Sequence, residues 1–379
     1  MSVRDVFFRA IRETVFGCKE AVSNVCDFDA LYNLAKKQDF AHIVAAYINS
    51  NKIKPDKSVL DKFTVSYNNA VFSSAKQEFV LSEIKRIFTD GKIDFIALKG
   101  SVIRFLYNES FMRTSRDIDV LIKECDLKKA CSILLENGFV QKSDNDYHDI
   151  SFYFSSVHLE LHFNIKENIQ SVDKILSNAW EYTEKIGEYE YAETKDFFVF
   201  HHMAHMLYHV YNGGCGVKPF VDLYILKCNG YCDGSLLNVL LSESGLLTFY
   251  NKCLELSEVW FGGRAHDNFT ETFEKYILFG GAFGVKENAD AVKNAKSKNR
   301  FTAVLRYLFP SYYNMTALYP FLNKNKLCAV LLPFCYIHRL LKGVFKKRKK
   351  GISNVKGISS GNSENTAKTA ELLKELGLE

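Results

Sequence analysis

Proline is scarce in this sequence, with five prolines among 379 residues, and there is no internal repeat. Helices are therefore rarely interrupted, and 31 phenylalanines and 20 tyrosines supply bulky core side chains. The sequence also lacks an apolar run of the roughly 20 residues that span a bilayer. The nearest candidate, Cys328–Ile337, is too short and contains Pro333. The composition predicts a densely packed, largely helical protein without a membrane-spanning segment.

Paired cysteines and strong charge are lacking as well. The ten cysteines are scattered, and only Cys228 and Cys232 lie close together. Because the N-terminus also lacks a long apolar stretch, we expect free thiols in a reducing cytoplasm. The net charge of +5 is modest and is concentrated near the C-terminus, so no nucleic-acid partner is expected.

The hydrophobic pattern predicts an α+β fold in four regions. Strand-like runs at 93–98, 117–122, 147–154 and 157–164 alternate with helical segments at 101–107 and 126–135, which indicates a small mixed sheet. The expected regions are an N-terminal helical region (1–90), an α/β core (91–166), a C-terminal helical domain (167–345) and a basic tail (346–379). Within this tail we expect disorder at 351–366 and a short helix at 367–376.

Two aspartates lie in the second predicted strand, Asp117-Ile-Asp-Val-Leu-Ile122. Successive side chains of a strand point to opposite faces, so Asp117 and Asp119 share one face while Ile118 and Val120 enter the core. Adjacent carboxylates repel, so such a pair tends to share a proton or to bind a cation. The alternative is a solvated strand edge on which the aspartates pair with nearby arginines.

A small turn, Gly100-Ser101, precedes these aspartates. Its backbone N–H groups could approach a phosphate, helped by the positive end of the helix that begins there. Lys99 is a candidate phosphate contact, or else a solvated strand end. A phosphate site beside a carboxylate pair is typical of phosphoryl or nucleotidyl transfer.

A third carboxylate is predicted on a later strand, Val157-His-Leu-Glu-Leu-His-Phe163. Alternation places His158, Glu160 and His162 on one face and the apolar residues on the other. A core-packed strand with such a polar face beside the aspartate pair would line a cleft.

These segments resemble a known family. Leu98-Lys99-Gly100, Arg113 and Asp117-Ile-Asp-Val-Leu are similar to the motifs of an uncharacterised bacterial nucleotidyltransferase family in the DNA polymerase β superfamily. The gap between turn and aspartates is longer here than is usual in the superfamily, so the resemblance supports the aspartates more strongly than Ser101.

The resemblance implies a polymerase-β-like mixed-sheet core and roles for individual residues. The catalytic and Mg²⁺-binding residues would be Asp117, Asp119 and Glu160. The nucleotide contacts would be Lys99, Gly100, Ser101 and Arg113, with orientation of the aspartates as the alternative role of Arg113. We add Arg116 as a nucleotide contact, although it lies outside the family pattern and a surface charge is an equal alternative.

A histidine-rich segment, His201-His-Met-Ala-His-Met-Leu-Tyr-His209, places three histidines on one helix face. We expect His205 to line the cleft opposite the carboxylates, and His158 and His162 to line it beside them. A packing or ferrying role for the histidine face, or a zinc site, is the alternative. Asp222 follows in a segment that resembles a basic-apolar-Asp motif of the family. We expect Asp222 to line the cleft as well, where it is a candidate for orienting a histidine or binding nucleotide, with a helix cap as the alternative.

The sequence thus predicts a Mg²⁺-dependent nucleotidyltransferase that moves a nucleoside monophosphate from an NTP to a small-molecule or protein hydroxyl. The alternative is a catalytically inactive nucleotide-binding or scaffold protein of the same fold, and hydrolysis or phosphotransfer at the same metals is a third. The acceptor, the preferred NTP and the oligomeric state are left open.

The amphipathic run Leu331–Phe345 precedes the basic run Lys346-Lys-Arg-Lys-Lys350. This pair favours two interpretations: weak peripheral contact with an anionic membrane, or a packed last helix followed by a solvated charge run.

Overall fold

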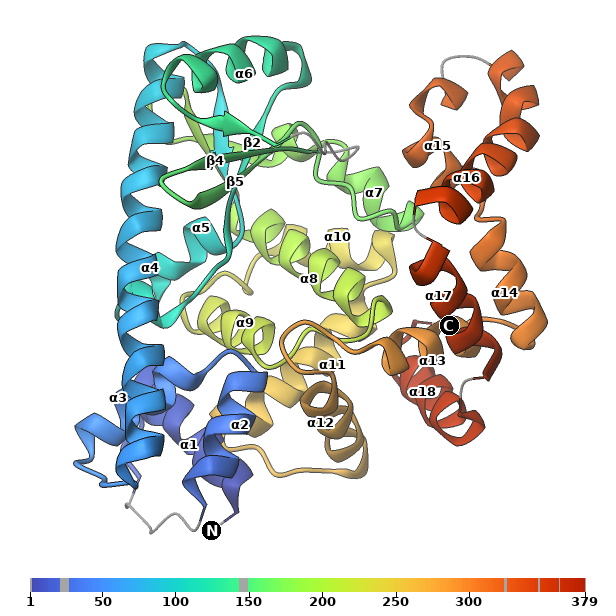
Figure 1. The fold of residues 1–379 in the computed structure, drawn as a ribbon. Helices are drawn as coiled ribbons and strands as arrows, with labels where there is room; N and C mark the ends of the chain where they lie inside the picture. The colour runs from blue at the N-terminus through green and yellow to red at the C-terminus, as the bar shows by residue number, and fades with distance from the viewer. Residues whose placement is uncertain are drawn as a thin grey trace.

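The computed structural model describes residues 2–20, 27–142, 149–323, 326–346, 348–360 and 362–378. One seven-stranded mixed sheet lies between helices that precede and follow it in the chain (Figure 1). The predicted fold class is therefore confirmed: an α+β protein with a mixed-sheet core flanked by N- and C-terminal helical regions.

Four helices precede the sheet: α1 (Val3–Phe16), α2 (Phe28–Lys37), α3 (Ala41–Ser50) and α4 (Lys57–Asp90). A capping box between Ser2 and Asp5 begins α1, and Gly17 ends it at a φ of 71°. Helix α4 is much longer than the amphipathic pattern at 78–88 indicates, because residues 57–90 contain neither proline nor glycine. It runs from the N-terminal helices to the sheet (Figure 1).

The strand order of the sheet is β3-β4-β5-β2-β1-β7-β6. Its strands are β1 (Phe95–Ala97), β2 (Asp117–Ile122), β3 (Val140–Gln141), β4 (Asp149–Phe154), β5 (Val157–His162), β6 (Thr183–Lys185) and β7 (Glu190–Glu193). β2 is antiparallel to β1 and parallel to β5, which makes the sheet mixed. The predicted hairpin between β4 and β5 is present, whereas the expected strand residues 147 and 148 lie outside the described residues.

The two faces of the sheet pack against different parts of the chain. Ile118, Val120 and Leu159 belong to one buried cluster with residues of α4 and of α6 (Leu127–Glu136). Leu121 projects from the opposite face into a larger cluster, which is formed mainly by the N- and C-terminal helices. Because Asp117 and Asp119 alternate with Ile118 and Val120, they share this second face, toward the helical regions.

Strands β6 and β7 extend the sheet beyond residue 166, the end expected for the α/β core. β7 pairs in parallel with β1, and β6 pairs with β7. Both strands lie within 167–345, where the pattern favours helices. The helix predicted at 101–107 is in fact a single turn, α5 (Gly100–Ile103), followed by the 3₁₀ turn η1 (Arg104–Leu106).

The C-terminal region is otherwise helical. Its helices are α7 (Gln170–Leu176), α8 (Lys195–Tyr211), α9 (Lys218–Cys228), α10 (Ser235–Ser244), α11 (Leu247–Ser257), α12 (Asn268–Gly280), α13 (Lys286–Ala295), α14 (Arg300–Leu308), α15 (Tyr312–Leu318), α16 (Leu332–Lys346), α17 (Arg348–Ser360) and α18 (Ser363–Glu375). Over the described part of the chain, no helix is both long enough and apolar enough to cross a membrane.

The expected disorder at 351–366 is wrong. Helix α17 covers most of this segment and packs against α13, α14 and α16, while α18 packs against α12 and α13. These tertiary contacts stabilise helices that the Ser-, Gly- and Asn-rich composition does not favour on its own.

Candidate functional site

The register between β2 and β5 brings the predicted carboxylates together. Asp117 lies opposite His158, and Asp119 lies opposite Glu160, on two neighbouring parallel strands. Both aspartates and Glu160 therefore share the face that is turned toward the helical regions. This local alternation is what the sequence predicts for the three residues.

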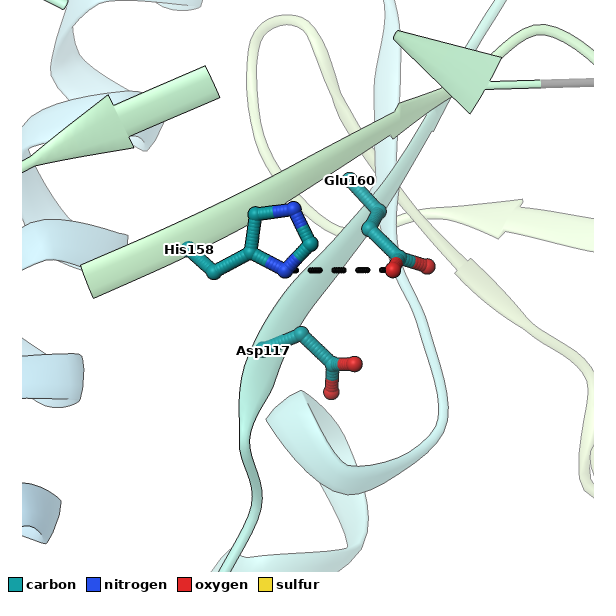
Figure 2. A group of neighbouring side chains, drawn as sticks. All are labelled: Asp117, His158 and Glu160. Atoms are coloured by element: carbon teal, nitrogen blue, oxygen red, sulfur yellow. Dashed lines mark ion pairs between the residues drawn. The ribbon is translucent and has the colours of Figure 1, made fainter. Parts of the chain in front are cut away.

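Two overlapping groups of metal-ligand atoms occur among the described residues. One contains Asp117, His158 and Glu160, and the other Asp119, Glu160 and His162, with the ligand atoms of each group within 4.8 Å of one another. Figure 2 shows the first group converging from the two strands, with His158 Nδ1 3.8 Å from Glu160 Oε1. Glu160 belongs to both groups and lies between them.

The carboxylates carry more negative charge than their surroundings balance. Burial, followed by repulsion from Asp119 and Asp117, raises the pKa of Glu160 to about 8. Burial and repulsion from Asp119 also raise the pKa of Asp117. At neutral pH the metal-free site therefore retains a proton on Glu160, and a divalent cation would relieve the same repulsion.

Asp119 is the best compensated of the three carboxylates. Its Oδ1 lies 3.4 Å from Lys99 Nζ and 2.9 Å from His162 Nε2. Burial alone would raise the pKa of Asp119, but Lys99 and His162 hold it well below its usual range. Lys99 itself adopts a φ of 47°, an uncommon conformation for a residue with a side chain, at the point where β1 passes into α5.

The predicted phosphate turn is tightly packed. A Cβ at Gly100 would lie 3.2 Å from Ser115 Oγ, so this position favours glycine. Gly100 O accepts a hydrogen bond from Arg104 Nε, at 3.1 Å. The side chain of Ser101 is buried, and its Oγ has no hydrogen-bond partner within the described structure.

Arg113 pairs with Asp222 rather than with the aspartates of β2. Its Nε donates to both Asp222 carboxylate oxygens, at 2.8 and 2.9 Å, and Tyr107 OH donates to the same carboxylate at 2.6 Å. Asp222 is 1% exposed, and although burial opposes ionisation, Arg113 lowers the pKa of Asp222. Asp222 lies inside α9, so it neither caps that helix nor hydrogen-bonds a histidine in the described contacts.

Arg116 lies over an aromatic ring. Its guanidinium carbon is 3.6 Å from the centre of the Phe283 ring, and both side chains are exposed. This geometry is a cation–π contact. Its exposure fits the surface-charge alternative for Arg116, and no ion pair with Asp117 or Asp119 occurs among the contacts of the described residues.

A cavity of about 310 Å³ joins these elements. The core lines it with Lys99, Gly100, Arg113, Arg116, Asp117 and Asp119, and the helices line it with His201, His202, His205, His209, Lys218 and Asp222. The expected cleft-lining residues His205 and Asp222 are among them. Ser101, Glu160, His158 and His162 are not among its lining residues, and the last three lie on β5 beside Asp117 and Asp119.

Two of the cavity-lining histidines of α8 contact glutamates that the sequence does not single out. His205 Nδ1 lies 2.7 Å from Glu167 Oε1, and His201 Nδ1 lies 2.9 Å from Glu193 Oε1. Burial and nearby Lys99 lower the pKa of His205 to about 3, so it is neutral at pH 7. Glu193 reaches the cavity because β7 joins the sheet, and no local sequence signal indicates that pairing.

Lys218 is a further residue that sequence reasoning missed. Its Nζ contacts the carboxylate of Asp39 and lies 3.0 Å from Thr114 Oγ1, inside the cavity. These contacts join the turn after α2, the loop before β2 and the first turn of α9.

A mixed sheet that carries one buried and two half-buried carboxylates beside a cavity is consistent with a nucleotidyltransferase core. The family described as "Uncharacterised nucleotidyltransferase" matches residues 24–262, and the chain belongs to this family. No curated protein and no solved structure matches the chain. Membership confirms the resemblance seen in the motifs and supports nucleotidyl transfer as the general class of activity.

Proposed function

We propose that the protein is a Mg²⁺-dependent nucleotidyltransferase that moves a nucleoside monophosphate from an NTP to a hydroxyl acceptor and releases pyrophosphate. The observation that carries this proposal is the convergence of Asp117, Asp119 and Glu160 on one face of the sheet, next to the cavity. One lysine contacts this cluster, and the raised pKa values of Asp117 and Glu160 indicate an unmet need for positive charge.

The donor atoms fit the proposed metal. Carboxylate oxygens are the ligands that Mg²⁺ prefers, and Asp117, Asp119 and Glu160 would hold one or two ions. Bound Mg²⁺ would stabilise charge at the transferred phosphate and lower the pKa of the attacking hydroxyl. The same carboxylate oxygens would also suit Mn²⁺, so both ions belong in the assay.

The residues of the chain would bind and orient the two substrates. Lys99 and Gly100 line the cavity beside the carboxylates, where they would contact the triphosphate. In the transfer, the acceptor oxygen forms a bond to the α-phosphorus while the bond from that phosphorus to the bridging oxygen of pyrophosphate breaks. Glu160 would accept the proton that the acceptor hydroxyl loses.

The acceptor is proposed to be a small molecule or a protein side chain. The cavity of about 310 Å³ has the dimensions of a small-molecule site, which supports an acceptor of limited size. The neutral His205 and the Glu193–His201 pair on the opposite wall would contact the acceptor. His201 Nε2 is buried without a hydrogen-bond partner in the described structure, so a substrate hydroxyl could pair with it.

The first experiment is a calorimetric titration with a non-hydrolysable NTP, with and without Mg²⁺. Binding should require the metal and weaken in Asp119→Asn, whereas Asp61→Asn, at an exposed position on α4, should bind as wild type. Equal affinity with and without metal in all three proteins would contradict the site assignment.

The second experiment follows transfer of label from α-³²P-NTP to acceptors in a cell extract or to the protein itself. Glu160→Gln should keep most NTP affinity but lose activity on the order of 10²–10³-fold, the usual effect of removing one preorganised charged group. Unchanged transfer in Glu160→Gln would remove Glu160 from the site. Tight Mg²⁺-dependent binding without transfer from any of the four NTPs would favour the inactive scaffold.

A further inference from the structure

One long segment of the chain contains no acidic residue. Between Asp290 and Glu364 there is no Asp or Glu, while 15 Lys and Arg residues are present. The whole chain has a net charge of +5, so the remaining residues together sum to −10. Such a separation of charge indicates an anionic partner for the basic part. This segment includes α14, α15, α16 and α17, which we call the basic lobe.

The basic lobe also exposes an apolar stripe on the turn η7 (Lys326–Leu331) and on α16. The stripe residues are between 44% and 80% exposed. Three of them recur on α16 at intervals of three and four positions, so they lie along one side of that helix, and the other three lie on the preceding turn η7. They are Leu327, Val330, Leu331, Phe334, Ile337 and Leu341.

The opposite side of α16 faces the lobe. Cys335 is buried with Met315 and Leu322 in a small cluster. Arg339 donates hydrogen bonds to the carbonyl oxygens of Leu308 and Tyr307, at 2.9 and 3.1 Å. These contacts fix the rotation of α16, so the apolar stripe is held outward. The packed-helix interpretation of this segment therefore accounts for only one of its two sides.

We propose that the apolar stripe and the basic residues that follow it dock the protein on the surface of an anionic lipid bilayer, with α16 lying parallel to the membrane plane. A helix with one apolar side and neighbouring lysines is the composition of an interfacial helix. The run Lys346-Lys-Arg-Lys-Lys350 directly continues α16 in the sequence, and Lys342 is exposed on it. Lipid phosphates would provide the acidic charge that the lobe lacks.

Other occupants fit these observations less well. A second copy of the same lobe would bring together two segments with 15 basic residues each and no acid to balance them. A nucleic acid would satisfy the charge but would leave exposed aliphatic residues such as Leu327 and Ile337 without an apolar partner. A bilayer offers both an anionic surface and a hydrocarbon layer.

The test is co-sedimentation of the full-length protein with vesicles of neutral phosphatidylcholine or of phosphatidylcholine with 30% phosphatidylglycerol. Phe334 is 67% exposed on α16, and Phe72 is 65% exposed on α4, so Phe334→Gln and Phe72→Gln are matched variants. Wild type should sediment with the anionic vesicles and less so as salt is added. Phe334→Gln should bind at least roughly tenfold more weakly, and Phe72→Gln should bind as wild type.

Charge and insertion are tested separately. Lys349→Gln and Lys350→Gln should each weaken binding by about fivefold. A Phe334→Trp variant should show a blue-shifted emission on anionic vesicles if the side chain enters the bilayer, which gives a readout independent of any loss of binding. Thermal melts of all variants check that they are folded.

The proposal is overturned if wild type does not bind anionic vesicles, or if Phe334→Gln and Phe72→Gln bind equally well. A self-association that sedimentation velocity detects in wild type, that Phe334→Gln abolishes and that occurs without vesicle binding would assign the apolar stripe to a second copy instead.

Discussion

Replacing Glu160 by glutamine should make the metal-free protein more stable while it impairs the proposed activity. Burial and repulsion by Asp119 and Asp117 raise the pKa of Glu160 from 4.5 to about 8. For an acid whose pKa is raised by folding, the folded state binds more protons than the unfolded state between these two values. The free energy of unfolding therefore falls as the pH rises from about 4.5 to about 8. A glutamine of nearly the same shape does not titrate and avoids this loss.

The size of the effect follows from the pKa shift. The ordinary pKa of Glu160 is 4.5, so pH 7 is 2.5 units above it. At about 1.4 kcal/mol per unit, the folded protein loses ~3 kcal/mol of its free energy of unfolding between pH 4.5 and pH 7. The side chain is 29% exposed, so solvent screening reduces this to about 2 kcal/mol. We expect a rise in melting temperature of roughly 2–5 °C for Glu160→Gln at pH 7.

The assay is urea unfolding and thermal denaturation in EDTA at pH 5, 6, 7 and 8. The difference between Glu160→Gln and wild type should grow with pH, and Glu243→Gln, at an exposed position on α10, should follow wild type. Adding Mg²⁺ should stabilise wild type more than Glu160→Gln, because metal binding adds stability only where its ligands are intact. A variant less stable than wild type in EDTA at pH 7 and 8 would refute the reasoning.

Two other predictions concern buried charge away from the carboxylate cluster. Asp222→Asn should lower the free energy of unfolding by about 3–5 kcal/mol, because it leaves Arg113 buried without its charged partner. Urea unfolding measures this change, and a loss below ~1 kcal/mol would contradict the prediction. Burial lowers the pKa of His42 from 6.5 to about 4, so between these pH values the unfolded state binds more protons than the folded state. The free energy of unfolding should therefore fall by up to ~3 kcal/mol as the pH is lowered through this range. His42→Gln should remove this part of the pH dependence, and an unchanged slope in urea titrations would count against it.

The carboxylate cluster could be predicted because its signals are local. Alternation within β2 and within β5 places Asp117, Asp119 and Glu160 on one face once the two strands are recognised. The family resemblance indicated Glu160 as the third carboxylate, whereas the pairing of the two strands, which sets Asp119 opposite Glu160, is seen only in the structure.

The partners of the cavity residues outside β2 and β5 could not be predicted in this way. Glu193 lies on β7, whose sequence Glu-Tyr-Ala-Glu lacks the apolar alternation of a typical strand, and it meets His201 only because β7 pairs with β1. Arg113 illustrates the same limit. Its sequence position near the aspartates indicates a role beside them, yet its partner Asp222 is 109 residues away. Such long-range pairs are decided by tertiary packing and leave no periodic signal in the sequence.

One half-buried ion pair and its hydrogen bonds connect three regions that differ in sequence pattern. Asp39 follows α2, Thr114 precedes β2, and Lys218 begins α9, and all three meet at the cavity. Separating these regions would leave Lys218, which is 16% exposed, without its carboxylate and hydroxyl partners. The family match, residues 24–262, includes every one of these contacts, whereas the basic lobe lies entirely outside it. The carboxylate cluster thus lies within the family match and the proposed lipid-binding surface lies outside it. Loss of lipid binding in Phe334→Gln should therefore leave Mg²⁺-dependent NTP binding unchanged.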